Sequence, residues 1–182
     1  ENLIIMADSP EVIEAREKTN DKLYFAEIVK TNPTLIEWAN EEIRDDKEIL
    51  KSAISVDAGA LEFASDRLKA DKEIALLAGK GAGWTACYFS PELKADKEVM
   101  MSAAQNDGQV LYFASEELRD DKDVVMAAVT AKPLIVKYAS LRLRLDKDVA
   151  LAAIGKAKKK VTDFFPPEVL EYDEIKEILA EE

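Results

Sequence analysis

The chain has 182 residues, 48% of them hydrophobic, and carries a net charge of −12 with a pI of about 4.6. The hydrophobic content excludes a disordered chain, and no apolar run approaches the roughly 20 residues of a membrane span. Binding to nucleic acid depends on clustered Lys and Arg, so the acidic balance argues against it and favours a basic protein partner.

Cysteine content and the N-terminal residues bear on the compartment. A single cysteine, Cys87, excludes an internal disulfide framework and predicts a cytoplasmic or other reducing location. The same composition is compatible with delivery into a host cell. The first residues lack the features of a signal peptide and an initiator Met, so we expect the chain to be part of a longer protein.

An Asp-Lys pair recurs with a constant step of 25 residues. It begins at residues 21, 46, 71, 96, 121 and 146. A fixed period of this size is typical of stacked supersecondary units. We therefore predict an all-α fold, an α-solenoid of six two-helix repeats of about 25 residues with capping helices at both ends, forming one domain over 1–182. The segments are an N-terminal cap at 1–20, repeats at 21–45, 46–70, 71–95, 96–120, 121–145 and 146–171, and a C-terminal cap helix at 172–182.

The first helix of each repeat is expected to begin at the Asp of the pair, taken as position 1. Its carboxylate can accept hydrogen bonds from the first-turn N–H groups, and apolar residues at positions 4, 5, 8 and 9 form one stripe. The Lys at position 2 does not suit a helix N-terminus. We interpret it as an ion-pair partner of an acid in the adjacent repeat, or as a stem packed across the seam. Replacing Lys97 with Met would test this.

The second helix of each repeat is expected after Gly, Pro or Asn near positions 11–14. Apolar residues at positions 15, 16, 18 and 19 predict its buried face, with the aromatic at position 18 filling the core. Residues such as Ser90-Pro91-Glu92-Leu93 predict a short bridging turn, followed at position 24 by a basic residue paired locally with the next Asp. In the sixth repeat one extra residue near 156–160 restores the register, so that Phe164 takes the aromatic position and Val169 the buried position of the turn.

The unit at 96–120, from Asp96-Lys97-Glu98-Val99 to Glu117-Leu118-Arg119-Asp120, closely resembles the repeats of the domain-of-unknown-function family numbered 4116. The resemblance covers about residues 21–155. It implies tandem helical repeats, and it carries over no catalytic residue or cofactor.

No catalytic constellation stands out. The sequence has no histidine, which removes the usual general base and imidazole metal ligands. Gly79–Gly83 lacks phosphate-loop spacing, and we interpret it as a turn. Asp45-Asp46 and Asp120-Asp121 are interpreted as helix caps with one role. We predict no cofactor, no metal and no enzymatic activity.

We expect a non-catalytic protein-interaction scaffold or targeting module. Candidate partner contacts are Trp84, the repeat lysines and a basic run; they are Lys47, Lys72, Lys97, Lys122, Lys156, Lys158, Lys159 and Lys160. Two alternatives stay open. One is a substrate-positioning accessory region of an enzyme, and the other is a phospholigand or nucleic-acid site formed by the lysines at 156–160.

Overall fold

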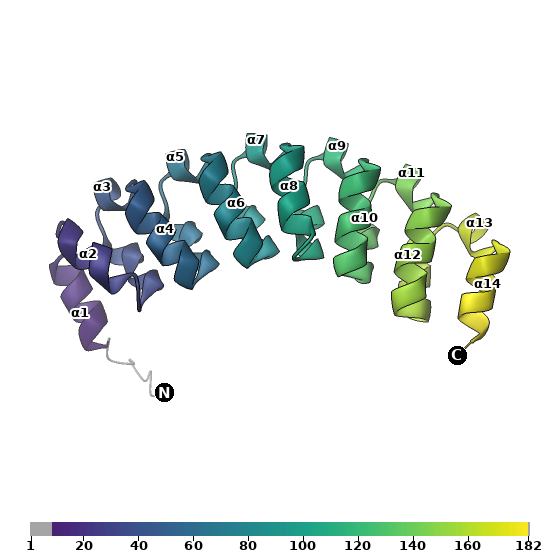
Figure 1. The fold of residues 1–182 in the computed structure, drawn as a ribbon, viewed down its shortest axis with the longest axis horizontal. Coiled ribbons are helices and arrows are strands. Elements are labelled where there is room, and N and C mark those ends of the chain that lie inside the picture. The colour runs from purple at the N-terminus through teal and green to yellow at the C-terminus, as the bar shows by residue number, and fades with distance from the viewer. Residues whose placement is uncertain (1–8, 182) are drawn as a thin grey trace, which may run out of the picture.

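A computed structural model describes residues 9–181 of the chain. Within this range the chain forms helices and no strands. The helices are stacked in sequence order into an arch, with the N-terminal helix at one end and the C-terminal helix at the other (Figure 1). The all-α repeat solenoid predicted from the 25-residue period is therefore the fold observed.

Each repeat contains three helices. A longer α-helix runs from the convex edge toward the concave edge of the arch, a 3-10 helix packs against it, and a four-residue α-helical turn returns the chain along the convex edge (Figure 1). The longer helices are α2 (Lys22–Ile28), α4 (Lys47–Val56), α6 (Lys72–Gly81), α8 (Lys97–Ala104), α10 (Lys122–Ala131) and α12 (Lys147–Ala157). The 3-10 helices are η1 (Pro33–Trp38), η2 (Ala58–Phe63), η3 (Gly83–Tyr88), η4 (Gly108–Tyr112), η5 (Pro133–Tyr138) and η6 (Lys158–Phe164). The turns are α3 (Glu41–Arg44), α5 (Asp66–Lys69), α7 (Pro91–Lys94), α9 (Glu116–Arg119), α11 (Leu141–Arg144) and α13 (Pro167–Leu170).

The second helix of each repeat is a 3-10 helix, which the sequence did not predict. Three residues per turn place positions 13, 16 and 19 in one row and positions 14 and 17 in another. In the fourth repeat Gly108, Leu111 and Ala114 are accordingly buried, whereas Gln109 and Tyr112 are exposed. The 3-10 helices therefore present an outward row, formed by positions 14 and 17 of each repeat, along the arch.

The core is continuous from one end of the stack to the other. Buried Ile, Leu and Val side chains of the longer α-helices meet those of the 3-10 helices, and a buried Ala at position 8 lets neighbouring helices approach closely. The backbone also crosses the seams between the first five repeats, because the N–H at position 20 donates to the carbonyl of position 24 in the preceding repeat. Ser90 N, for example, lies 3.1 Å from Lys69 O.

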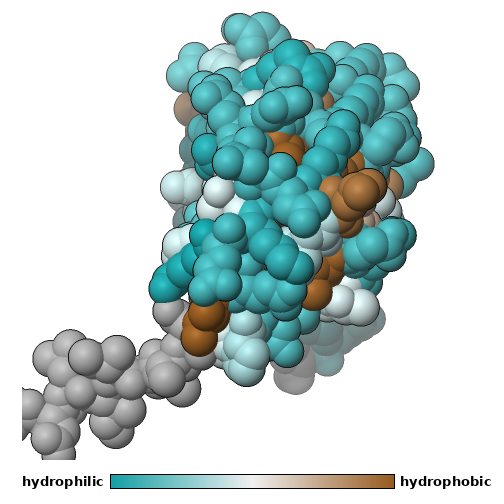
Figure 2. Space-filling view, turned by 90° about the vertical axis from the view of Figure 1, so that its left-hand side faces the viewer, coloured by the Kyte–Doolittle hydropathy of each residue, from teal (hydrophilic) through white to brown (hydrophobic). Residues whose placement is uncertain are grey.

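Both ends are capped by helices. Helix α1 (Pro10–Glu17) covers η1, and its Arg16 guanidinium lies 3.9 Å from the centre of the Trp38 ring. Seen from this end, the surface is mostly hydrophilic, with few hydrophobic side chains showing (Figure 2). At the other end α14 (Asp173–Ala180) buries Ile175 against the last repeat.

The extra residue of the sixth repeat is absorbed in its 3-10 helix. Lys158 has a φ of 50°, the one positive value outside glycine among residues 9–181. This left-handed backbone lets the chain take up one residue without shifting the core register. Val169 is buried and Phe164 packs half-buried against the core, in the places that the sequence register assigned to them.

Candidate functional site

Each Asp-Lys pair joins two repeats. The Oδ1 atom of Asp121 accepts hydrogen bonds from the N–H groups of Asp123 and Val124 and so caps α10. Its Oδ2 atom accepts a bond of 2.7 Å from the Nζ atom of Lys97 in the preceding repeat. The equivalent contacts form what we call the Lys–Asp ladder; they are Lys22–Asp46, Lys47–Asp71, Lys72–Asp96, Lys97–Asp121 and Lys122–Asp146. The ion pair expected between position 2 and an adjacent repeat is thus present.

The ladder engages four of the lysines predicted as partner contacts. Lys47, Lys72, Lys97 and Lys122 each bond to the Asp at position 1 and to the acid at position 3 of the next repeat. Hydrogen bonds to these carboxylates raise the pKa of each lysine. In this structure the four ammonium groups therefore join neighbouring repeats. Their role in partner contact stays a prediction.

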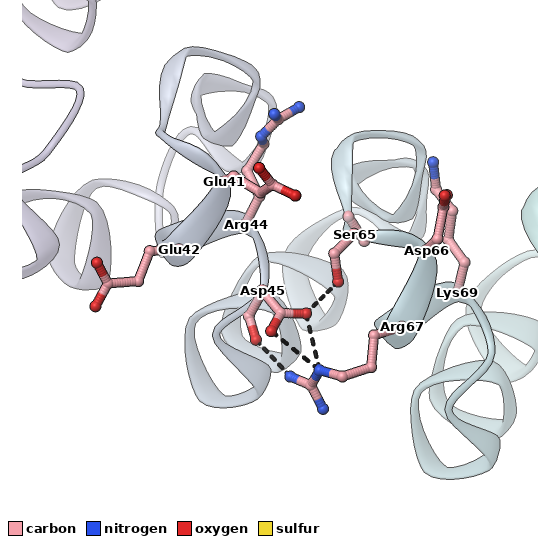
Figure 3. A pocket seen from close by; sticks show the side chains of 9 residues that line it. Glu41, Glu42, Arg44, Asp45, Ser65, Asp66, Arg67 and Lys69 are labelled. Atoms are coloured by element: carbon pink, nitrogen blue, oxygen red, sulfur yellow. Dashed lines mark hydrogen bonds and ion pairs between the residues drawn. The ribbon is translucent and has the colours of Figure 1, made fainter.

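A second type of inter-repeat contact occurs at two seams. The hydroxyl of Ser65 donates to Asp45 of the preceding repeat, and the Nε atom of Arg67 lies 2.9 Å from the same carboxylate (Figure 3). Asp120, Ser140 and Arg142 repeat this arrangement three units later. We call each triplet a clasp. The prediction that Asp45 and Asp120 have the same capping role as their neighbours is wrong, because each reaches across a seam instead.

At two other seams the serine at position 20, Ser90 or Ser115, bonds to a different acid. Where position 22 is Glu, as at Glu92, the bond from Ser90 lowers the pKa of that glutamate within one repeat. Position 25 of the preceding repeat is then Ala70, which has no carboxylate. Position 22 is Arg only where position 25 of the preceding repeat is Asp, so the two positions change together.

An open pocket of about 600 Å³ lies beside the first clasp on the convex edge (Figure 3). Its wall includes Glu41, Asp66, Arg67 and Lys69, with few apolar groups. The bonds from Ser65 and Arg67 lower the pKa of Asp45, which keeps it an anion already satisfied by its neighbours. This pocket has the features of a structural seam and not those of a ligand site, whose wall is usually largely apolar.

The basic residues at position 24 do not pair with the next Asp as predicted. Arg119 donates from Nε to the carbonyl of Ala114 at 3.0 Å and from Nη2 to that of Tyr112, and Lys94 donates to the carbonyl of Cys87. The carbonyls at the end of a 3-10 helix lack helical partners, so a nearby cation is well placed to satisfy them. Arg119 and Lys94 therefore hold the 3-10 helix of their own repeat against the short turn that follows it.

The aromatic column at position 18 does not fill the core. Trp38, Phe63, Tyr88, Phe113 and Tyr138 are all half-buried and pack against the core without being enclosed by it. The interior is filled instead by positions 15, 16 and 19, such as Val110, Leu111 and Ala114. Position 18 shares a row of the 3-10 helix with buried position 15, but it is the last residue of that helix in four of these repeats, so its ring packs at the edge of the core.

Large apolar side chains are exposed together between η4 and η5. Tyr112 is 50% exposed and Leu134 is 46% exposed, and both line a pocket of about 430 Å³ with Tyr138. The Tyr112 and Tyr138 ring centres lie 4.8 Å apart with an angle of 65° between their planes. Gln109, Phe113, Lys132, Ile135 and Lys137 complete the wall of this η4–η5 pocket. The sequence did not predict this pocket, although an aromatic at position 17 of one repeat beside an apolar residue at position 14 of the next is its signal.

Trp84 lies at position 14, in the same outward row of the 3-10 helices. It belongs to η3, the 3-10 helix that precedes η4. Its ring packs so closely over Gly59 that a Cβ atom there would lie 3.2 Å from Cη2, and it meets Tyr88 edge-on at 6.2 Å between centres. The side chain is nevertheless 39% exposed. Trp84 is therefore both packed on the neighbouring turn and available at the surface.

The lysines at 156–160 do not converge on a common point. Lys156 Nζ donates to Thr130 O at 2.6 Å, whereas Lys158 Nζ lies 3.5 Å from Glu181 O at the C-terminal cap. Lys159 has interactions of its own, and Lys160 is exposed. No shared anion-binding geometry follows from this arrangement.

Metal binding, membrane insertion and thiolate chemistry have little support in residues 9–181. No cluster of three or more acidic, Cys or His side chains there could hold a metal ion, and no helix there is long and apolar enough to span a membrane. Cys87 is half-buried, and burial is the main reason that its pKa is raised, which opposes thiolate chemistry.

The repeats match a known family model. The model described as Domain of unknown function (DUF4116) matches five overlapping windows at 21–63, 46–94, 71–119, 96–144 and 121–169. The chain belongs to this family. No curated protein and no solved structure matches the chain. The family assignment agrees with the tandem helical repeats, and the description names no activity.

Proposed function

We propose that the chain is a protein-binding module of the DUF4116 family that holds part of its partner in the η4–η5 pocket. The observation that carries this proposal is the joint exposure of Tyr112 and Leu134 beside Tyr138 around one concave site. Tyrosine is enriched among residues that dominate binding energy, and exposed apolar groups gathered in one place mark interaction surfaces.

The other exposed apolar side chains do not gather in this way. Leu23 is 81% exposed at the start of α2, and Leu141 is 57% exposed on the convex edge. Neither lines the η4–η5 pocket or the pocket beside the first clasp. Single exposed residues of this kind are common on protein surfaces and need no partner.

The repeat architecture supports the same proposal. A solenoid offers a long surface held in place by its own core, which suits recognition of an extended partner. The Lys–Asp ladder and the clasps fix each repeat against the next, so the pocket walls from η4 and η5 keep their spacing before the partner arrives. Preorganised walls lower the entropic cost of binding.

The test compares partner capture by three forms of the chain. Immobilised wild type, the Tyr112→Ser/Leu134→Ser variant and a Leu23→Ser control are incubated with lysate of the source organism, and bound proteins are quantified by mass spectrometry. We expect a set of proteins that the double variant loses and the Leu23→Ser control retains.

Equal capture by all three forms would refute the proposal. Far-UV circular dichroism and urea unfolding of each variant show whether the fold is kept. Both substituted side chains are about half exposed, so the double variant should remain folded.

A further inference from the structure

The outward row at position 17 changes character along the arch. From the second repeat to the fifth it reads Glu62, Cys87, Tyr112 and Lys137, after Glu37 in the first. Glu37, Glu62, Tyr112 and Lys137 are exposed and Cys87 is half-buried. Equivalent positions of successive repeats form rows on the surface of a solenoid. The position-17 row therefore passes from acidic to apolar to basic along the arch. The η4–η5 pocket lies at the passage from apolar to basic.

The basic end of this row belongs to a wider basic segment. Residues 131–164 contain nine Lys and Arg, three Asp and no Glu, whereas the whole chain has a net charge of −12. Several of these cations form ion pairs with acids of neighbouring elements, such as Arg142 with Asp120 and Lys147 with Glu174. Lys132 and Lys137 are exposed, line the pocket and make no ion pair with any residue that the structure describes.

Lys137 is also coupled to the aromatic wall. Its Nζ atom lies 4.9 Å from the centre of the Tyr138 ring, within cation–π range. A positive charge is thereby held at the edge of the apolar surface that Tyr112 and Tyr138 form. A ligand that fills the pocket with an apolar group would place its flanking groups beside this charge.

We propose that the η4–η5 pocket binds an acidic peptide segment of a partner protein, with one large apolar side chain seated between Tyr112, Leu134 and Tyr138. Carboxylates flanking that side chain meet Lys132 and Lys137. This inference rests on the proposed function and adds the chemistry of the ligand. It differs from the basic partner that the net charge of the whole chain favours, because the charge at the pocket has the opposite sign to the total.

The pocket suits a peptide better than a nucleic-acid strand. Single strands bind along grooves that combine stacking faces with a continuous track of cations. Here the two tyrosine rings stand at 65° to each other, and the row turns acidic toward Glu62 within two repeats of Tyr112. A strand longer than a few nucleotides would meet that acidic end, whereas a short acidic segment need not.

The test is selection from a display library of random twelve-residue peptides on the immobilised chain at about physiological salt. Sequences enriched on wild type and lost on the Tyr112→Ser/Leu134→Ser variant are compared with the starting library. We expect an excess of Asp and Glu around at least one large apolar residue. The best peptide should bind the Lys132→Glu/Lys137→Glu variant about tenfold or more weakly. A Lys80→Glu control on α6 should bind within about twofold of wild type.

The outcomes separate the two proposals. Pocket-dependent peptides that are neutral or basic, or that bind Lys132→Glu/Lys137→Glu as tightly as wild type, would overturn the acidic ligand and leave the proposed function standing. A library that yields no pocket-dependent peptide would count against both. Pocket-dependent binding of a labelled oligothymidylate, tighter than that of the best peptide, would replace the peptide with nucleic acid.

Discussion

Lys97 and Asp121 lie 2.7 Å apart across a seam, and the carboxylate that receives the lysine also caps α10 with its other oxygen. One residue pair therefore begins a helix and fixes that helix against the preceding repeat. This double use explains why Asp and Lys recur together, although a lysine at a helix N-terminus is unfavourable for its own helix. The 25-residue period of the sequence therefore reflects this contact, which recurs at each seam of the ladder.

The two sides of this contact should differ in their effect on stability. Asp121→Ala removes both the ion pair and the cap, and the cap alone contributes about 1 kcal/mol. Lys97→Met removes the ion pair and keeps the stem, so it should lower the urea midpoint less than Asp121→Ala does. The double variant should be close to Asp121→Ala, since the lysine has then lost its main partner. Full additivity of the two single effects would contradict the coupling, and Lys30→Met, which breaks an exposed pair within one repeat at the end of α2, provides the control.

At pH values up to about 8, stability should depend on pH only in the acidic range. The bond from the preceding lysine is the main reason that the pKa values of Asp46 and Asp96 are lowered. At Asp71, Asp121 and Asp146 partial burial is the largest influence and raises the pKa, but bonds from lysine and backbone N–H groups outweigh it.

A carboxylate with a lowered pKa binds fewer protons in the folded state than in the unfolded state. Its contribution is therefore present above the unfolded pKa of about 4 and is lost as the pH falls through the folded value. Urea unfolding should give a steady free energy from about pH 8 to 5.5 and a decline below about pH 4.5. A decline between pH 6 and 8 would contradict this account, because the sequence has no histidine to cause it.

Two glycines should respond in opposite directions to alanine. A Cβ atom at Gly108 would press on the carbonyl oxygen of Ala128 and lie 2.9 Å from the Cβ atom of Lys132. Gly108→Ala should therefore destabilise by about 1–3 kcal/mol. Gly155, within α12, has nothing within 4 Å of such an atom, so Gly155→Ala should stabilise by up to about 1 kcal/mol through helix propensity. Urea unfolding of both variants measures the contrast, and equal shifts would show that the close approach of η4 to α10 is unimportant.

The clasp should be convertible into the other type of seam. Asp45→Ala/Arg67→Glu gives this seam the residues that accompany Ser90, namely alanine at position 25 and glutamate at position 22. We expect the double variant to be more stable than Asp45→Ala alone, because Ser65 regains an acid within its own repeat and Arg67 no longer lacks its partner. Thermal unfolding of the single and double variants tests this. A double variant less stable than Asp45→Ala would refute the equivalence of the two seam types.

The repeat made much of the fold predictable, since the starts of the longer helices, their aspartate caps, most buried positions and the place of the extra residue near 156–160 follow from one period. The type of the second helix did not follow, because apolar positions 15, 16 and 19 are compatible with either an α-helix or a 3-10 helix. That choice decides whether positions 14 and 17 fall in one outward row, so the η4–η5 pocket was missed with it. The role of Asp45 was hidden for another reason: beside Asp46, it resembled a second helix cap.

The ladder also makes the length of the molecule adjustable. Each lysine requires only that an aspartate stand at the start of the following unit, and every internal unit supplies one. Removing residues 71–95 would bring Lys47 opposite Asp96, and duplicating them would add one more identical junction. Growth or loss in whole units thus preserves every bond of the ladder, so arrays of different length can be built from one junction.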